Sequence, residues 1–296
     1  MWSSASPVEA QDAPCSHPAC SASDAIGNAC RIYFDAPTGR IALNAPDITG
    51  TVTGISRDQP DGCFDPTRPY GLQGWRYNTR GGHKIERILF IQRGDVMHFG
   101  LLDDDGNDYA DGFVWLVPLP EGTQMRETSG VRCNARCTFD IDPIAEDEVF
   151  VLVGFSAKRQ DGDGHVLRFG VGPPTGDASE PGLPITFMDD RFNYDVILQY
   201  AYVPASIVAR RGTVSASYER NGGDVRRQLR AETGAGDAVL QGFDFVFRNG
   251  GHFIEDIGIE RREAEYEAWF QDNQGEDDRR RPDDPFEWRA DFVMLR

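Results

Sequence analysis

The sequence has few lysines, no long apolar run and none of the common catalytic motifs. Only Lys84 and Lys158 are lysines, and every other basic residue is an arginine. No stretch of about 18 apolar residues is present, so no membrane-spanning helix is expected. The Gly-x-Ser-x-Gly, His-Glu-x-x-His and P-loop patterns are absent, and we therefore expect a protein that is not an enzyme.

Cysteine is missing from the C-terminal half of the chain, because none of the six cysteines follows Cys137. An even number of cysteines in a loop-rich chain favours disulfides and an extracellular or cell-surface location. Local pairing is predicted, as Cys15–Cys20, Cys30–Cys63 and Cys133–Cys137. The alternative is a metal site formed by His17 with Cys15, Cys20 and Cys30, although this spacing is not a common zinc pattern.

Positive charge is scarce relative to negative charge. The 48 acidic residues outnumber the 30 basic residues and give a formal net charge of −18. Such a chain repels phosphate backbones and anionic lipids, so neither a nucleic-acid partner nor membrane insertion is expected. The excess of carboxylates favours solubility, the binding of cations, or both.

Three related segments follow one another along the chain. Each has a glycine, called the anchor glycine below, after a short apolar run and before an aromatic residue: Gly74-Trp75, Gly154-Phe155 and Gly242-Phe243. The anchor glycines are 80 and then 88 residues apart. Similarity at a nearly fixed period predicts a chain built from three similar units.

Each segment contains several short patterns typical of strands. In the third segment, the phenylalanines at 243, 245 and 247 alternate with Asp244 and Val246, as in a strand with one buried face. Further strands are expected at residues 31–34, 40–43, 51–55, 85–91, 96–102, 113–117, 166–171, 185–188, 192–198, 254–259, 266–270 and 286–292. The segment 260–269 has helix propensity but aligns with a strand at 94–101, so a strand is predicted there. The Gly-Gly-His and Gly-Asp-Gly-His sequences are typical of hairpin turns.

These patterns predict an all-β protein of three tandem antiparallel β-sandwich repeats, similar to jelly rolls, with a disulfide-tied N-terminal arm. The 32 glycines and 18 prolines agree with many turns and few long helices. The predicted division is an arm at 1–30 and units at 31–122, 123–206 and 207–296.

Acidic turns in the first and third segments are candidate metal sites. Oxygen ligands crowded on a turn suit Ca²⁺, which takes six to eight of them. The candidate ligands are Asp103, Asp105, Asn107 and Asp108 in the first segment, and Asp272 and Asp277 in the third. The glycine and glutamate that complete an EF-hand are missing. A solvated turn is the alternative, because Asp, Asn and Gly are favoured in turns in any case.

Repeated histidines are a weaker candidate for ligand binding. The residues concerned are His83, His165 and His252, each after a glycine, together with Glu86 and Glu255. If each segment carried a site, these side chains would line it. A polar residue beside a turn more often bonds the backbone, so a structural role is the alternative. Arg168 is near the position that corresponds to Glu255, which weighs against a site shared by all three segments.

Aromatic residues recur at two places in each segment. They follow the anchor glycines as Trp75, Phe155 and Phe243, and they recur in the last strand as Trp115, Tyr194 and Trp288. Alternate positions on a strand usually face the core, and we expect these rings to be buried. Stacking against sugar rings is the alternative for any ring that is exposed.

The sequence favours a secreted, non-catalytic binding protein. Three related units would give multivalency, with a surface carbohydrate as ligand and calcium as a structural or bridging ion. A self-assembling structural protein of a cell surface, filament or particle is the second hypothesis, because sheet edges can pair with one another. An enzyme acting on polysaccharide is the third.

Overall fold

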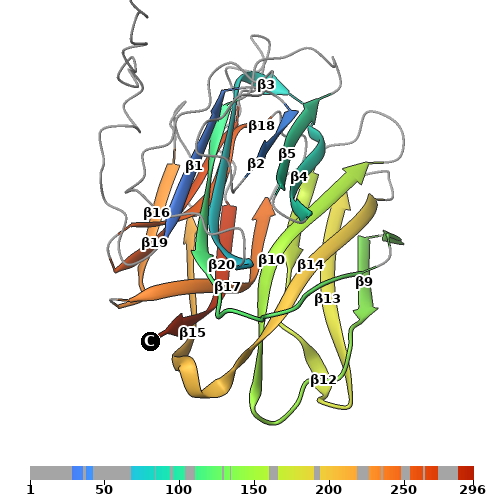
Figure 1. Cartoon of the computed structure of the whole chain (residues 1–296). Coiled ribbons are helices and arrows are strands. Elements are labelled where there is room, and N and C mark those ends of the chain that lie inside the picture. Colours follow the sequence, from blue (N-terminus) through green and yellow to red (C-terminus); the bar gives the residue numbers. More distant parts are fainter. Residues whose placement is uncertain are drawn as a thin grey trace, which may run out of the picture.

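A computed structural model describes residues 29–35, 38–42, 68–83, 85–93, 96–103, 111–128, 130–133, 135–159, 166–189, 194–218, 227–234, 236–247, 254–262, 264–272 and 286–296. Apart from turns and one 3-10 helix, η2 (Ala205–Ile207), these residues form strands (Figure 1). The predicted all-β class is confirmed. Residues 260–262 end one strand and residues 265–269 belong to the next, so the described part of 260–269 contains strands rather than a helix.

The strands form three antiparallel sheets. Sheet A contains β1 (Cys30–Asp35), β6 (Asp111–Pro118), β3 (Tyr70–His83), β18 (Ile254–Arg262), β19 (Glu265–Asp272) and β16 (Arg227–Glu232), in that order. Sheet B contains β2 (Thr38–Ala42), β5 (Val96–Asp103), β4 (Ile85–Arg93), β10 (Glu148–Arg159), β14 (Tyr194–Pro204) and β7 (Met125–Glu127), and β8 (Val131–Cys133) also pairs with β14. Sheet C contains β12 (Thr175–Asp177), β13 (Glu180–Asp189), β11 (Val166–Val171), β17 (Asp237–Phe247), β20 (Phe286–Leu295) and β15 (Val208–Tyr218), and β9 (Ala135–Asp140) also pairs with β13.

The same pattern of strand pairing occurs three times, once for each segment. The strands that carry the anchor glycines are β3, β10 and β17, called the anchor strands below. Each pairs on one side with the last strand of its own segment, as β3–β6, β10–β14 and β17–β20. On the other side each pairs with a strand of a different segment, as β3–β18, β10–β4 and β17–β11. The three segments therefore close into a ring of shared sheets.

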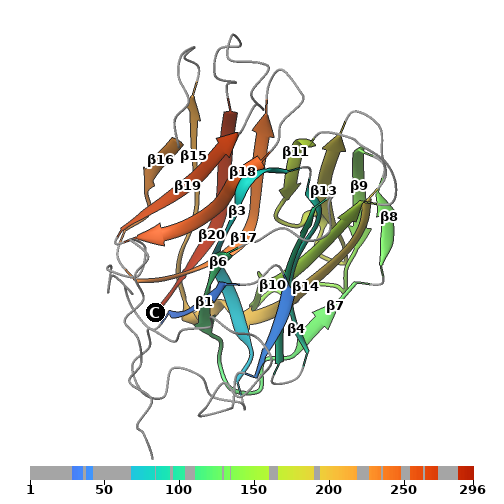
Figure 2. The same cartoon turned by 90° about the horizontal axis from the view of Figure 1, so that it is seen from above.

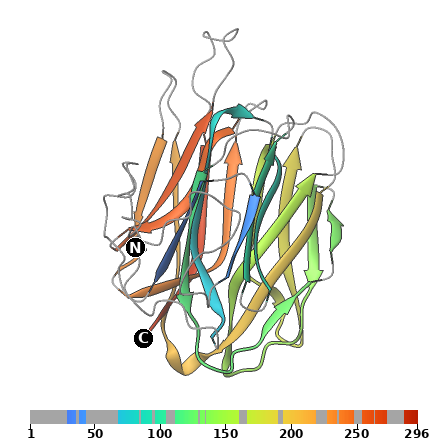
Figure 3. The same cartoon turned by 45° about the horizontal axis from the view of Figure 1, so that its top comes forward.

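The pictures show this exchange directly. In Figure 2 the cyan strand β3 of the first segment lies beside the orange strand β18 of the third. Figure 3 shows blue and teal strands of the first segment in one sheet with green and yellow strands of the second. Each sheet is thus built from strands of two of the three segments.

The expected arrangement of three tandem jelly-roll-like sandwiches is not confirmed, because each segment is divided between two sheets. The predicted hairpins after the anchor strands are wrong. β3 and β4 lie in different sheets, as do β10 and β11, and β17 and β18. Gly81, Gly82 and His83 belong to β3 itself. Alternation of apolar residues shows which face of a strand is buried but does not select its partner strand. The unit boundaries after residues 30, 122 and 206 stay a prediction.

The anchor glycines lie where an anchor strand approaches its partner strand from a different segment. Each follows an irregularity in the pairing with the last strand of its own segment. A Cβ atom built on Gly154 would be 2.3 Å from the carbonyl oxygen of Phe90. The corresponding distances are 2.4 Å from Gly242 to the oxygen of Val171 and 2.5 Å from Gly74 to that of Ile259. The glycine is repeated because the neighbouring backbone leaves no room for a side chain.

One aromatic cluster joins the three anchor strands. Trp75, Phe155 and Phe243 are buried, and the distances between their ring centroids are 5.5, 5.6 and 5.1 Å. Trp115, Tyr194 and Trp288 are also buried. The prediction that these rings belong to the core is confirmed. Because one residue from each segment meets at the same point, the three sheets share one core cluster.

Buried tyrosines make the fold sensitive to alkaline pH. Tyr266 is fully buried, its hydroxyl has no hydrogen-bond partner among the described residues, and burial raises its pKa above the ordinary value of 10.0. Burial likewise raises the pKa of Tyr77, although its hydroxyl donates to the oxygen of Leu89 and accepts from the N–H of Gly100. The folded state keeps the two phenol protons at a pH where the unfolded chain releases them. The free energy of unfolding is therefore unaffected by these two tyrosines below about pH 10 and decreases as the pH rises above it.

Replacing Tyr266 by phenylalanine tests this relation. At pH 7 the free energy of unfolding should be unchanged or slightly higher, because the hydroxyl has no partner. Above pH 10 the free energy of unfolding should decrease less steeply with pH, by about 1.4 kcal/mol per pH unit. The variant has no phenol at position 266 whose ionisation would favour the unfolded chain. Urea unfolding between pH 7 and 11 measures both effects. An equal slope in the variant and the wild type would contradict this assignment.

Candidate functional site

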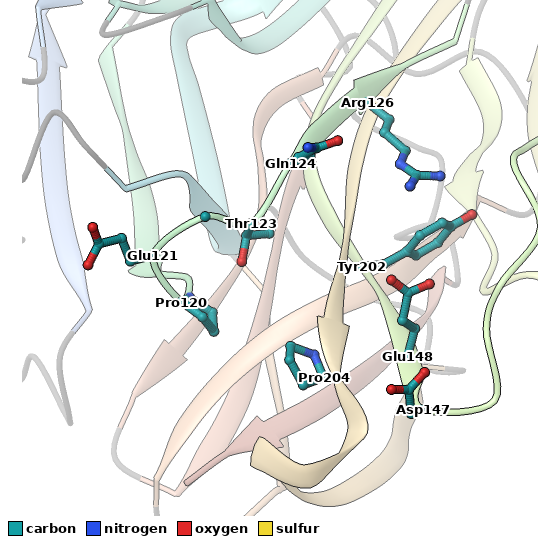
Figure 4. Close-up of a pocket in the computed structure, with 10 residues that line it drawn as sticks. Pro120, Glu121, Thr123, Gln124, Arg126, Asp147, Glu148, Tyr202 and Pro204 are labelled. Carbon is teal, nitrogen blue, oxygen red and sulfur yellow. The ribbon is translucent and has the colours of Figure 1, made fainter.

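A polar cavity of about 380 Å³ is lined by the connection after β6, the start of β10 and the end of β14 (Figure 4). The lining residues that carry functional groups are Glu121, Thr123, Gln124, Arg126, Asp147, Glu148 and Tyr202. Volumes of roughly 300–1,000 Å³ are usual for small-molecule sites. The cavity is therefore large enough for a small ligand.

A tight turn begins one wall of the cavity. The N–H of Thr123 donates to the oxygen of Pro120 at 3.1 Å, and Gly122 between them has a φ of 79°. Glycine adopts such left-handed backbone without a steric penalty. The chain then enters β7, where Arg126 is paired with Tyr200 of β14. This pairing places the side chain of Arg126 at the cavity.

Arg126 and Tyr202 are in direct contact within the site and are both hydrogen-bonded to Asp142. The guanidinium of Arg126 lies 4.5 Å from the centre of the Tyr202 ring and donates to Asp142 at 2.8 Å. The Tyr202 hydroxyl donates to the backbone oxygen of Asp142, and the N–H of Asp142 donates to the hydroxyl of Tyr200 at 3.3 Å. Burial is the main reason that the pKa values of Tyr200 and Tyr202 are raised. Both phenols are therefore neutral hydrogen-bonding groups at neutral pH.

Carboxylates dominate the rest of the cavity. Glu121 and Asp147 are exposed, and Glu148 is half-buried. The N–H of Ala145 donates to one carboxylate oxygen of Glu148 at 3.2 Å. Among the described residues that line the cavity, Arg126 is the only cation, and its charge is already paired with Asp142. The cavity therefore repels anions and offers acceptors to hydroxyl or amino groups.

The described residues that line this cavity include none of the ligand-binding residues expected from the sequence. His83, Glu86 and Glu255 lie in β3, β4 and β18, and the structure does not describe their side chains. His165 and His252 lie outside the described residues. Pro118, Pro120 and Pro204 are typical of connections between strands and do not by themselves indicate a site. Nothing in the sequence showed that these two connections lie side by side.

The acidic turns expected to bind calcium lie at the ends of described strands or outside the described residues. Asp103 and Asp272 end β5 and β19, and their side chains are not described. The remaining candidates, Asp105, Asn107, Asp108 and Asp277, lie outside the described residues. In the part of the chain that is described, no three His, Cys, Asp or Glu side chains are placed to hold a metal ion together. Calcium binding stays a prediction.

The disulfide between Cys133 and Cys137 is confirmed. It joins β8 to β9 and thereby connects an edge of sheet B to an edge of sheet C. Cys30 is also disulfide-bonded, which argues against its use as a metal ligand. Cys15, His17, Cys20 and Cys63 lie outside the described residues, so the predicted pairs Cys15–Cys20 and Cys30–Cys63 stay predictions.

No protein-family model matches the chain, and no curated protein matches its sequence. Across the described ranges, no helix is long and apolar enough to cross a membrane.

Proposed function

We propose that this is a non-catalytic binding protein of the extracellular space or cell surface, and that its polar cavity binds a neutral carbohydrate. The observation that carries this proposal is the combination of carboxylates with a partly exposed guanidinium around one cavity (Figure 4). A sugar hydroxyl both donates and accepts hydrogen bonds. Glu148 and Asp147 would accept from sugar hydroxyls, and Arg126 and Gln124 would donate to them.

The charge of the cavity selects among sugars. Three carboxylates, those of Glu121, Asp147 and Glu148, line the cavity together with one guanidinium that is already paired, so a sugar with a carboxylate or sulfate group would be repelled. The aromatic face of Tyr202 is partly covered by Arg126, at 4.5 Å from the ring centre. We therefore expect hydrogen bonding to hydroxyls, rather than ring stacking, to provide most of the affinity.

Among the described residues, the first and third segments do not repeat the proposed site. By strand register, Pro118 and Met294 occupy the positions in the first and third segments that Tyr202 occupies in the second. Neither residue can reproduce its aromatic ring or its hydroxyl. Multivalent binding would therefore require further sites, such as the repeated histidines. If calcium assists ligand binding, the acidic turns would hold the ion. Self-association rests on no contact of the described residues, and we do not propose it.

Replacing Glu148 by glutamine tests the proposal. The amide removes one charge and one acceptor from the cavity, so affinity for a neutral oligosaccharide should fall about tenfold or more. A glycan array with and without calcium identifies the oligosaccharide, and isothermal titration calorimetry measures its affinity.

Glu180→Gln is the matched control, because it removes the same charge from an exposed position at the start of β13. This control should bind as the wild type does. The proposal fails if no neutral glycan binds, or if the two variants have equal affinity.

A further inference from the structure

The three junctions between segments are, in the order used below, the strand pairings β3–β18, β17–β11 and β10–β4. An arginine–aspartate pair crosses the first two of them. Arg76, two positions after its anchor glycine, donates through Nε and Nη2 to Asp256 at 2.9 and 2.7 Å. At the second junction the roles are exchanged, and Arg168 donates through the same two atoms to Asp244 at 2.9 and 2.5 Å. Both pairs have the bidentate geometry in which a guanidinium binds a carboxylate most strongly.

The third junction has the arginine but lacks the carboxylate. Ser156 is two positions after its anchor glycine, as Asp244 is, and it pairs with Leu89 as Asp244 pairs with Gly170. Arg87 is two positions before Leu89, which is the place that Arg168 has relative to Gly170. The Nε atom of Arg87 is buried and has no hydrogen-bond partner among the described residues.

Leu89 explains why the chain does not supply its own carboxylate at this junction. A Cβ atom built on Gly170 would lie only 2.5 Å from Oδ1 of Asp244, so the pair at that junction requires a glycine. Leu89 occupies the corresponding position beside Ser156. An aspartate at position 156 could not adopt the same conformation. Ser156 in place of an aspartate and Leu89 in place of a glycine both exclude an internal carboxylate at this junction, whereas the guanidinium of Arg87 is present.

We propose that Arg87 binds the carboxylate of a small external anion at this junction. Two N–H groups of the guanidinium would hold the carboxylate as Arg168 holds Asp244, and the bond to Nε would satisfy the buried donor. Lys158 is exposed and lies directly opposite Arg87 in the pairing of β10 with β4, so it adds positive charge beside the site. Asp195 is opposite Lys158 on β14 and offsets part of that charge, which leaves Arg87 as the principal anchor.

This site is independent of the proposed carbohydrate cavity. The residues that form it are Arg87, Ser156 and Lys158, none of which lines the cavity. The cavity has an excess of carboxylates and repels anions, whereas at the junction the buried Nε atom of Arg87 has no hydrogen-bond partner among the described residues. The Glu148→Gln variant should therefore bind the anion as the wild type does, and failure of one proposal leaves the other standing.

Acetate and glucuronate are the probes, with glucose as the uncharged comparison. At constant ionic strength both anions should raise the melting temperature of the wild type, and glucose should not. Arg87→Gln should abolish this shift and weaken binding by about tenfold or more in calorimetry. Arg211→Gln, which alters an exposed arginine on β15, should leave the shift unchanged. Tighter binding of glucuronate than of acetate would assign the carboxylate to an acidic sugar, and equal binding to a simple carboxylate.

A second variant keeps the arginine and fills the site from within the chain. Leu89→Gly combined with Ser156→Asp should reproduce the pair formed by Arg168 and Asp244. It should lose anion binding while Arg87 is still present, and it tests the proposal even if Arg87→Gln fails to fold. The proposal is overturned if neither anion stabilises the wild type, if Arg87→Gln keeps the full shift, or if the double variant binds the anions as before.

Discussion

Gly154→Ala is expected to cost about 3 kcal/mol or more of the free energy of unfolding, or to prevent folding. The added Cβ would lie 2.3 Å from the carbonyl oxygen of Phe90, which belongs to the backbone of β4. A flexible side chain could move aside, but β4 is held between β5 and β10 and cannot move without breaking pairings on both sides. Overpacking in cores typically costs about 1–3 kcal/mol, and a collision with backbone belongs at or above the upper end.

Gly130→Ala is the control for this prediction. Its nearest neighbour would be a side-chain carbon of Ile197 at 3.7 Å, which is an ordinary contact. The change in stability should stay within about 0.5 kcal/mol. Urea unfolding followed by circular dichroism measures both variants. If Gly154→Ala were as stable as Gly130→Ala, close approach of the strands could not be the reason for the repeated glycine.

Trp75→Ala is expected to destabilise the protein by about 3–5 kcal/mol, the usual range for removing a large buried aromatic side chain. Its ring contacts Phe155 and Phe243 of the other two segments, with centroids 5.5 and 5.6 Å away. It also contacts Phe90 and Phe169, on the strands that pair with β10 and β17. The resulting cavity would therefore face all three sheets, and no single sheet could close it.

Trp75→Phe is the matched control, because phenylalanine occupies the corresponding position in the other two segments. The indole N–H of Trp75 has no hydrogen-bond partner among the described residues, so its removal costs no hydrogen bond. The loss should be clearly smaller than for alanine, about 1–2 kcal/mol from lost volume. Equal losses in the two variants would show that the aromatic cluster is not what joins the segments.

The sequence predicted the strands better than it predicted their neighbours. Alternation at Phe243, Phe245 and Phe247 identified β17 and its buried face, and the similarity to β5 placed residues 260–269 in strands despite their helix propensity. Both inferences use information local to the chain. The pairing of β3 with β18 could not be obtained in this way, because antiparallel partners far apart in sequence leave no local pattern.

The cavity was missed for a similar reason. Its walls come from residues 120–126, 147–148 and 202–204, and only the sheet brings these connections together. Arg87 illustrates a different limit. Its sequence neighbours give no sign that a carboxylate is missing, and the difference is visible only when the three junctions are compared by strand register.

The ring of shared sheets determines the order in which the protein can fold. The contact between Arg76 and Asp256 joins residues that are 180 positions apart, and it lies at the junction that closes the ring. During synthesis the first segment would emerge with β3 unpaired along one side, and it would have to wait until β18 had left the ribosome. Folding through such distant pairings is intrinsically slow. The closing junction is also where an unfinished chain would present an open sheet edge to other chains.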